Sequence, residues 1–340
     1  MTRVRPDVNE DALATALRAH YGIAPVSLSH VSGGEDASAW EYRVETGSAS
    51  PQYLLKVREA NRSRDVAAAV SRYLFEASLP HVVAPIRSNT SSLAVEDGEL
   101  WFTVYPFIVG RTGVEAGLLK RHWWALGSLV QRLHASVLPS DLSEQLATET
   151  YRPAEIDVVR RVDRAVSAQS FDRHAQEAAA FWTAHRAEIT ELAERTEELG
   201  QMVERLALPL VLCHADLHTW NVMIDGDGEL WLIDWDEVIR APKERDLMFV
   251  VGGIGAGLIE PHETATFFEG YGETTVDPLA LSYYRHAWAV QDIGGYGEQI
   301  FLTPSLRNES RSHAARILTG LFDPGGIVEL ALASVERRGH

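Results

Sequence analysis

One short segment of the chain holds most of the side chains able to do chemistry. It reads LCHADLHTWN and places His214 two residues before Asp216, with the amide of Asn221 five residues after that acid. The run from Leu208 to Cys213 is mostly apolar and predicts a strand that ends where the polar residues begin. We therefore expect a loop at a strand end that presents an acid and an amide together.

A second acid follows at the end of an expected hairpin. Val222–Ile224 and Leu230–Ile233 are strand-like runs separated by an Asp-Gly-Asp-Gly sequence, which is typical of a tight turn. Asp234 directly follows the second run. The hairpin would bring Asn221 and Asp234 to the same end, beside Asp216.

Two acids and an amide in this arrangement suit phosphoryl transfer from a nucleotide. The reaction needs a carboxylate beside the acceptor hydroxyl, and oxygen ligands that hold Mg²⁺ on the phosphates. The kinase loop pattern H-x-D-L-x-x-x-N is met from His214 to Asn221. We predict that Asp216 is catalytic, that Asn221 and Asp234 bind Mg²⁺, and that ATP is the phosphoryl donor. His214 is assigned a structural role.

The segment has two alternative interpretations. Its Asp and Asn residues could simply cap and turn the chain, although their joint spacing favours a site. His214 and His218 could bind zinc, but no further His or Cys ligand follows nearby.

The same motifs resemble those of the aminoglycoside phosphotransferase family, which has a protein-kinase-like fold. HADLHTWN and LIDWD are close to that family's catalytic-loop and metal-binding signatures. Four later stretches resemble the branch that acts on spectinomycin: DWDEVIRAPKERDLMFVVGG, FFEGYGETTVD, LSYYRHAWAVQDI and LFDPGGIVELA. The resemblance implies an ATP-dependent enzyme that phosphorylates a hydroxyl of an aminocyclitol antibiotic, with spectinomycin expected.

The composition agrees with such an enzyme. The 340 residues are 46% hydrophobic and carry 31 basic against 48 acidic residues, a net charge of −17. This charge argues against a nucleic-acid partner and suits a cationic small-molecule substrate. The one cysteine allows no internal disulfide, and the longest apolar run, Leu247–Ile259, is shorter than the roughly 20 residues of a membrane span. We expect a cytoplasmic monomer or weak dimer without a membrane partner.

The pattern of expected elements predicts an α+β fold with two lobes. Residues 1–106 would form a small antiparallel sheet with one helix, and residues 107–340 a larger, mainly helical lobe, with a hinge at about 105–110. The expected elements are a helix at Glu10–His20, strands at Val26–Val31, Trp40–Glu45 and Tyr53–Val57, a helix at Asp65–Ala77, a hairpin of Leu93–Val95 with Leu100–Tyr105, a helix at Val114–Val137, and two or three solvated helices within 141–206.

A lysine on the small sheet would bind the nucleotide phosphates. Lys56 lies mid-strand and is one of three lysines among the 31 basic residues. A compact ammonium suits the α and β phosphates, although a strand lysine can also be merely solvated. The following helix has no acid in its interior, so Asp65 in its first turn is the expected partner of Lys56. Asp65 could equally only stabilise the helix start.

Two further segments are expected at the nucleotide. The small-residue loop 32–38 would cover the phosphates with backbone N–H groups, and the segment after the last strand would bind adenine through its main chain. The expected residues are Gly33, Gly34, Ser38, Tyr105 and Phe107. A plain hairpin loop and a plain strand-to-helix connection are the alternatives.

The cationic methylamino groups of spectinomycin imply an acidic and aromatic binding site. The expected substrate residues are Asp236, Glu237, Trp288, Asp292 and Tyr296. A kinase of the same fold acting on a choline-like compound or another antibiotic is the alternative within the class. A non-catalytic homologue that only binds nucleotide is the alternative outside it, and the intact Lys56, Asp216, Asn221 and Asp234 argue against that.

Overall fold

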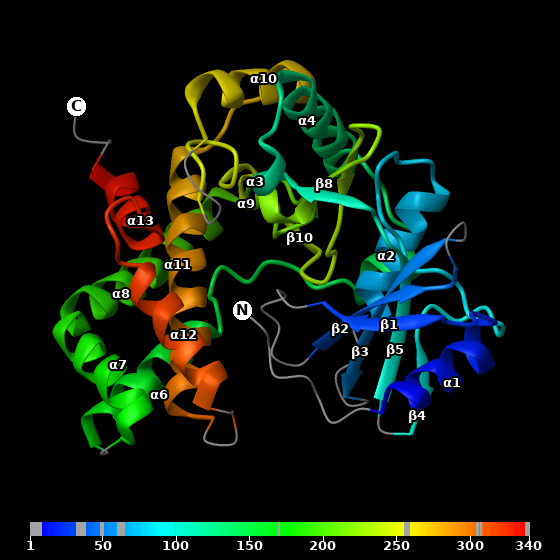
Figure 1. Ribbon diagram of the computed structural model, residues 1–340. Coiled ribbons are helices and arrows are strands. Elements are labelled where there is room, and N and C mark those ends of the chain that lie inside the picture. The colour runs from blue at the N-terminus through cyan, green and yellow to red at the C-terminus, as the bar shows by residue number, and fades with distance from the viewer. Residues whose placement is uncertain are drawn as a thin grey trace. The chain divides into compact units, whose positions relative to one another are not determined.

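Five antiparallel strands form the N-terminal sheet, in the order β1-β2-β3-β5-β4 (Figure 1). The strands are β1 (Ser27–His30), β2 (Ala39–Glu45), β3 (Gln52–Glu59), β4 (Val95–Asp97) and β5 (Leu100–Pro106). The computed structural model describes residues 9–31, 39–47, 51–59, 65–98, 100–168, 171–254, 259–303, 306 and 308–336. The predicted sheet and the β4–β5 hairpin are confirmed.

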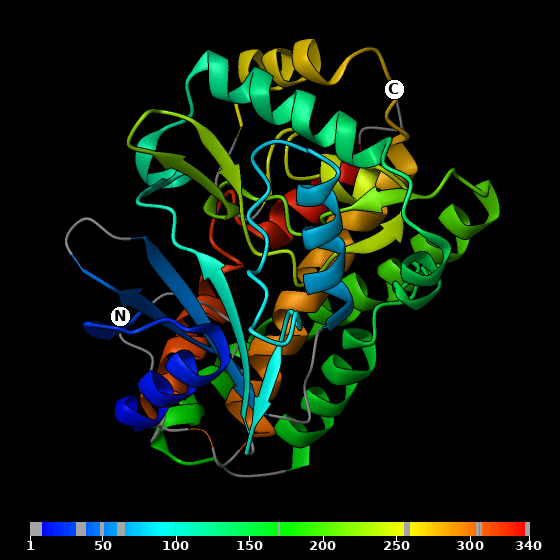
Figure 2. The same cartoon turned by 90° about the vertical axis from the view of Figure 1, so that its right-hand side faces the viewer.

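Side-chain alternation gives this sheet two distinct faces. Leu55 and Val57 of β3 are fully buried in one apolar cluster, to which helix α1 (Glu10–Tyr21) contributes Leu13 and Leu17. Figure 2 shows this helix, in dark blue, beside the sheet. Residues of a strand alternate between faces, so Lys56 and Arg58 lie on the opposite face from that cluster. A second helix, α2 (Asp65–Glu76), follows β3.

A smaller sheet carries the predicted catalytic segment. Strands β6 (Gly110–Thr112), β8 (Val222–Asp225) and β9 (Leu230–Leu232) pair antiparallel in the order β6-β8-β9. The short helix η1 (Thr219–Asn221) immediately precedes β8. The predicted hairpin is therefore confirmed, with Val222 opposite Leu232.

Two helices beside this region touch backbone to backbone. They are α4 (Lys120–His134) and the end of α10 (Pro261–Tyr271). A Cβ atom on Gly127 would lie 2.0 Å from the carbonyl oxygen of Phe267, and one on Gly270 would lie 2.0 Å from that of Trp124. Only glycine permits this contact at both positions.

The remaining elements are mostly helical. They are α3 (Gly113–Ala116), α5 (Ser140–Gln145), α6 (Glu155–Ala168), α7 (Arg173–Ala184), α8 (Arg186–Leu206), α9 (Glu244–Leu247), α11 (Pro278–Phe301), α12 (Asn308–Gly320) and α13 (Ile327–Glu336), with strands β7 (Val211–Cys213) and β10 (Ile239–Ala241) paired to each other. Helix α11 supplies Ile293 and Ile300 to a core that α6 and α7 share through Val162 and Trp182.

The chain forms two compact units, each built from three separate segments. The first contains Met1–Ala147, His214–Ile239 and Ala265–Glu273, and the second contains Thr148–Cys213, Arg240–Thr264 and Thr274–His340. The lobe boundary at residue 106 stays a prediction. These units group residues that lie close together in space, whereas the predicted lobes were defined by nucleotide and substrate binding.

Two predicted helical regions differ from the structure. The single helix expected at Val114–Val137 is wrong, because Gly117 adopts a left-handed φ of 69° and separates α3 from α4. The segment 141–206 contains parts of four helices rather than two or three. Those helices are also less solvated than expected, since α6, α7 and α8 bury apolar faces.

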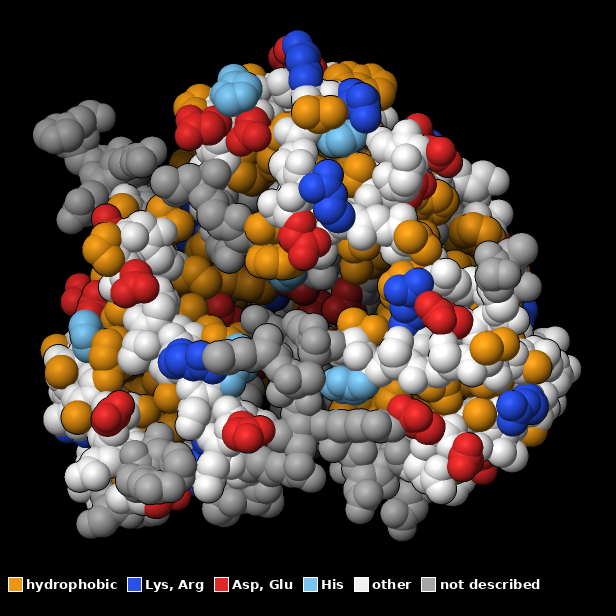
Figure 3. Space-filling model, in the orientation of Figure 1, with side chains coloured by type: hydrophobic (Ala, Val, Ile, Leu, Met, Phe, Trp, Pro, Cys, Tyr) orange, Lys and Arg blue, Asp and Glu red, His pale blue; other side chains and the backbone are white. Residues whose placement is uncertain are grey.

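Charge is spread over the surface. On the face drawn in Figure 3, acidic side chains occur in small groups interspersed with basic and apolar ones. None of the helices within the described ranges is long and apolar enough to cross a bilayer.

Candidate active site

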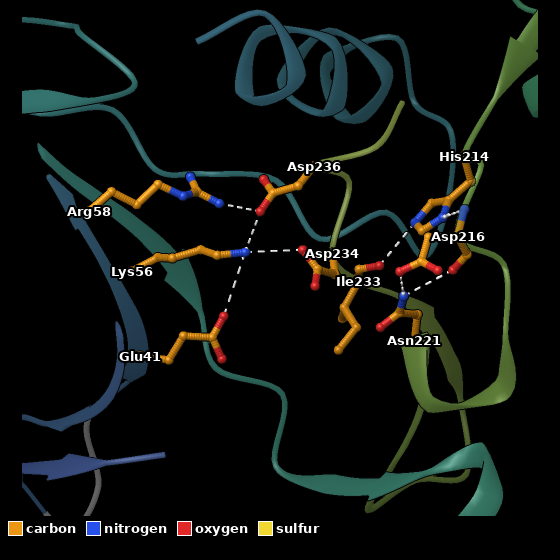
Figure 4. Close-up of polar contacts among 9 residues, drawn as sticks. All are labelled: Glu41, Lys56, Arg58, His214, Asp216, Asn221, Ile233, Asp234 and Asp236. Carbon is orange, nitrogen blue, oxygen red and sulfur yellow. Dashed lines mark hydrogen bonds and ion pairs between the residues drawn. The ribbon is translucent and has the colours of Figure 1, made fainter. Parts of the chain in front are cut away.

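His214 fixes the start of the catalytic loop. Its Nε2 donates to the carbonyl oxygen of Ile233 at 3.0 Å, and its Nδ1 accepts from the backbone N–H of Asp216 at 3.3 Å (Figure 4). The imidazole is fully buried. It therefore ties the loop to the residue just before Asp234, and the predicted structural role is confirmed.

The carboxylate of Asp216 is held at both oxygens. Nδ2 of Asn221 donates to Oδ2 at 2.7 Å, and Nε2 of His218 lies 3.2 Å from Oδ1. Burial alone would raise the pKa of Asp216, but the contacts with His218, His214 and Asn221 outweigh it and lower the pKa. The carboxyl group of Asp216 is thus ionised at neutral pH, as its predicted role as a base requires.

Asn221 and Asp234 meet at one end of the hairpin. The N–H of Ile233 donates to the carbonyl oxygen of Asn221 at 3.0 Å, which places Asp234 next to this pair. Asp234 has a left-handed φ of 58°, a conformation that Asp tolerates better than most residues. The side-chain nitrogen of Asn221 points to Asp216, so its Oδ1 is the atom able to bind a cation.

Lys56 lies among three carboxylates of the first unit. Its Nζ is 2.5 Å from Oδ2 of Asp236, 3.0 Å from Oδ1 of Asp234 and 3.6 Å from Oε1 of Glu41 (Figure 4). Burial would lower the pKa of Lys56, but Asp234, Asp236 and Glu41 together raise it well above its usual value. Lys56 is therefore a permanent cation beside Asp234, as a phosphate-binding lysine must be.

Arg58 is a second buried cation at the same place. Its Nη2 donates to Oδ2 of Asp236, the same oxygen that Lys56 contacts. Sequence reasoning missed both Arg58 and Glu41. Arg58 could have been predicted, because side chains two residues apart on a strand lie on the same face as each other. Glu41 could not, because its position opposite Lys56 follows from the register between β2 and β3.

Asp236 is the predicted substrate residue whose position differs most from expectation. The structure places its carboxylate on Lys56 and Arg58, inside the cation cluster. Its neighbour Glu237 is exposed. Both Asp234 and Asp236 contact Lys56, but the left-handed φ of Asp234 and the turn at Asp236 show that this segment is not an extended strand, so strand alternation could not have placed Asp236 there.

The other predicted residues lie elsewhere or outside the described part. Trp288, Asp292 and Tyr296 are on α11 in the second unit, and the indole of Trp288 packs edge-to-face on Phe249 at 4.9 Å. Gly33, Gly34 and Ser38 lie outside the described residues, as does the side chain of Asp65.

The expected adenine-binding segment begins at the end of β5. Tyr105 is half-buried, and burial raises the pKa of its hydroxyl. The N–H of Phe107 donates to the carbonyl oxygen of Gln52 at 3.0 Å. The Phe107 N–H is thus engaged with β3, and binding of adenine by main-chain groups of residues 105–108 stays a prediction.

The donors at the hairpin end fit a divalent cation. Oδ1 of Asn221 and the carboxylate of Asp234 are hard oxygen ligands of the kind that Mg²⁺ prefers. Lys56 contacts only Oδ1 of Asp234, and the Asp234 side chain is 41% exposed, so it can turn an oxygen to an ion.

A kinase-like sheet with a buried lysine, a loop aspartate and a following aspartate defines a phosphotransferase. A family model described as the phosphotransferase enzyme family, APH, matches residues 28–282. The chain belongs to this family, which uses ATP.

Solved structures support the same class. The chain is 32% identical to spectinomycin phosphotransferase, APH(9)-Ia, in complex with ADP and spectinomycin, with 97% of this chain and 99% of that chain covered and a TM-score of 0.85. The AMP-bound complex of that enzyme matches at 30% identity, 96% and 98% coverage and a TM-score of 0.80. An ethanolamine kinase of Plasmodium vivax shares the fold at 13% identity, 98% coverage of both chains and a TM-score of 0.59. Curated protein sequences gave no match.

These comparisons confirm two expectations from the sequence. The fold is protein-kinase-like, and the protein is a small-molecule kinase similar to the aminoglycoside and aminocyclitol phosphotransferases.

Proposed function

We propose that the protein phosphorylates spectinomycin, transferring the γ-phosphate of ATP to one of its hydroxyl groups. The observation that carries this proposal is the similarity over 97% of the chain to an enzyme whose structure contains ADP and spectinomycin. The net charge of −17 suits an acceptor with two cationic amines.

The described residues divide the reaction between them. The carboxylate of Asp216 accepts the proton of the acceptor hydroxyl, whose oxygen forms the new bond to the γ-phosphorus while the bond to ADP breaks. Lys56 binds the phosphates of the donor. Asn221 and Asp234 would hold Mg²⁺, which neutralises phosphate charge. Positioning and charge stabilisation then supply most of the rate.

The acceptor side is assigned to an acid and two aromatic residues of α11, Trp288 and Tyr296, which are each only 8% exposed. Trp288, Asp292 and Tyr296 are spaced four residues apart on α11 and therefore share one helix face. We assign these three residues to the cationic acceptor, because a carboxylate and aromatic rings both attract alkylammonium groups, and Glu237 of the first unit stays a separate prediction. We further propose that the enzyme acts in the cytoplasm as a monomer or weak dimer.

A panel of acceptors tests the proposal. The purified chain with Mg²⁺ and ATP would be given spectinomycin, kanamycin, choline or a macrolide, with ADP release measured and the product identified by mass spectrometry. We expect the highest kcat/KM with spectinomycin, and no product from an Asp216→Asn control. Turnover of choline without turnover of spectinomycin would replace the proposal with the choline-like alternative.

A further inference from the structure

Among the side chains that the structure describes, the acid closest to Lys56 does not come from helix α2. Among the described side chains of that helix, the acidic one is Glu76, which pairs with Arg72 at 2.7 Å and Arg87 at 3.1 Å. Lys56 instead has Asp236 at 2.5 Å, from the segment that follows β9. The ammonium is therefore oriented by a carboxylate distant from it in sequence.

Arg58 holds that carboxylate in place. Its side chain is 7% exposed and that of Asp236 is 13% exposed, so both charges have lost most of their water. A buried charge of this kind is tolerated only when it is paired. Both cations contact Oδ2 of Asp236, so Arg58 keeps the acid against β3 at the position of Lys56.

The two aspartates differ in how firmly they are held. Asp234 has one cationic partner within 4 Å among the described residues, Lys56, and is 41% exposed. Asp236 contacts at least two cations of the described residues, Lys56 and Arg58, and is largely buried. Asp234 is thus the acid able to leave Lys56 for an incoming cation, while Asp236 remains.

We infer that Asp236, clamped by Arg58, is the positioning residue that directs Lys56 toward the nucleotide phosphates, in place of an acid on α2. The inference rests on the nucleotide-dependent activity proposed above. It concerns the nucleotide alone and makes no use of the acceptor.

Replacing Asp236 separates this role from a simple effect of charge. Asp236→Asn removes a negative charge beside the phosphates, so electrostatics alone predicts tighter ADP binding. Loss of the positioning contact predicts the opposite. We expect ADP affinity, measured by calorimetry at fixed Mg²⁺, to fall about ten-fold, with Asp236→Glu restoring part of it.

Adenosine distinguishes positioning of Lys56 from a general defect. It has no phosphates, so its affinity should be the same in the wild type and in Asp236→Asn. ADP binding that is unchanged or tighter in Asp236→Asn would overturn the inference. An equal loss for ADP and adenosine would also overturn it.

Arg58 supplies the second arm of the test. Arg58→Gln should weaken ADP binding to a similar extent, and the double variant should lose no more than either single one. Arg87→Gln, which removes the same charge from an exposed pair, is the matched control. Independent, additive losses would show that Arg58 acts on the phosphates directly and not through Asp236.

Two variants keep the test decisive. Asp65→Asn compares the acid of helix α2 with Asp236. A loss of ADP affinity in Asp65→Asn alone would assign the positioning role to α2.

Arg58→Lys serves if Asp236→Asn does not fold, because it retains the charge without the planar guanidinium. A loss of affinity for ADP but not for adenosine would then support the role of Arg58 in holding Asp236. If the protein binds ADP but does not phosphorylate spectinomycin, the proposed acceptor is refuted, while the inference about Asp236 and Arg58 can still be tested by ADP binding.

Discussion

Nε2 of His218 lies 3.2 Å from Oδ1 of Asp216, while Asn221 contacts the other oxygen of the same carboxylate. The carboxylate therefore has a neighbour on each side: a hydrogen bond from Asn221 at Oδ2 and the imidazole of His218 at ion-pair distance from Oδ1, which is fully buried and accepts no hydrogen bond from the described residues. A carboxylate fixed in this way presents one orientation to an incoming hydroxyl.

Removing the imidazole should therefore slow the chemical step. His218→Leu should lower kcat about 10- to 100-fold and leave the KM for ATP nearly unchanged, because the base loses its alignment and the nucleotide contacts remain. His218→Gln can place an amide nitrogen near Oδ1 and should recover part of the loss. Steady-state kinetics check this, and an effect on KM alone would contradict it.

Asp216 itself should be needed for transfer but not for nucleotide binding. Asp216→Asn keeps the shape of the side chain and removes the base, so kcat should fall by roughly 10²–10⁴. ADP affinity measured by calorimetry should stay close to the wild-type value. Retained turnover would remove Asp216 from its assigned role.

Asp234 should link the nucleotide to the metal. In Asp234→Asn the hard anionic ligand is lost, and ADP binding should respond much less to Mg²⁺ than in the wild type. Titrations with Mg²⁺ and with EDTA give the comparison. An unchanged response to Mg²⁺ would place the ion elsewhere.

The lowered pKa of Asp216 fixes the direction of the pH profile. The base stays ionised until the pH falls below its usual value of about 3.9, so kcat should show no acid-side loss from Asp216 between pH 5 and 8. His218→Leu removes a contact that stabilises the carboxylate, so the acid limb of kcat should move to higher pH. An acid limb that does not move would show that His218 has no influence on this carboxylate.

A buried histidine in the second unit should make stability depend on pH. His286 of α11 is fully buried, and its burial lowers its pKa to about 4, below the usual value of about 6.5. The unfolded chain therefore binds the proton first, and stability is lost as pH falls from 6.5 to 4. The loss at pH 5 should be about 2 kcal/mol. Urea unfolding at pH 7 and pH 5 measures it, and His286→Gln should show a smaller pH dependence.

The sequence predicted the residues of the site better than their partners. Asp216, Asn221 and Asp234 are close in sequence, so strand and turn patterns alone placed them together. The link between Asp236 and Arg58 spans 178 residues, and no local pattern reports such a pair. The single helix expected at Val114–Val137 was wrong for a related reason. The helical spacing of apolar residues continues across Gly117, but the helical backbone conformation is interrupted there.

The two interleaved units also limit how this enzyme can be divided. The residues that surround Lys56 are contributed by Met1–Ala147 and His214–Ile239, and the polypeptide passes through the other unit between them. No single cut in the gene could release the nucleotide-handling half intact. An independently expressed fragment would need two new junctions, from residue 147 to residue 214 and from residue 239 to residue 265, because all three stretches belong to this unit.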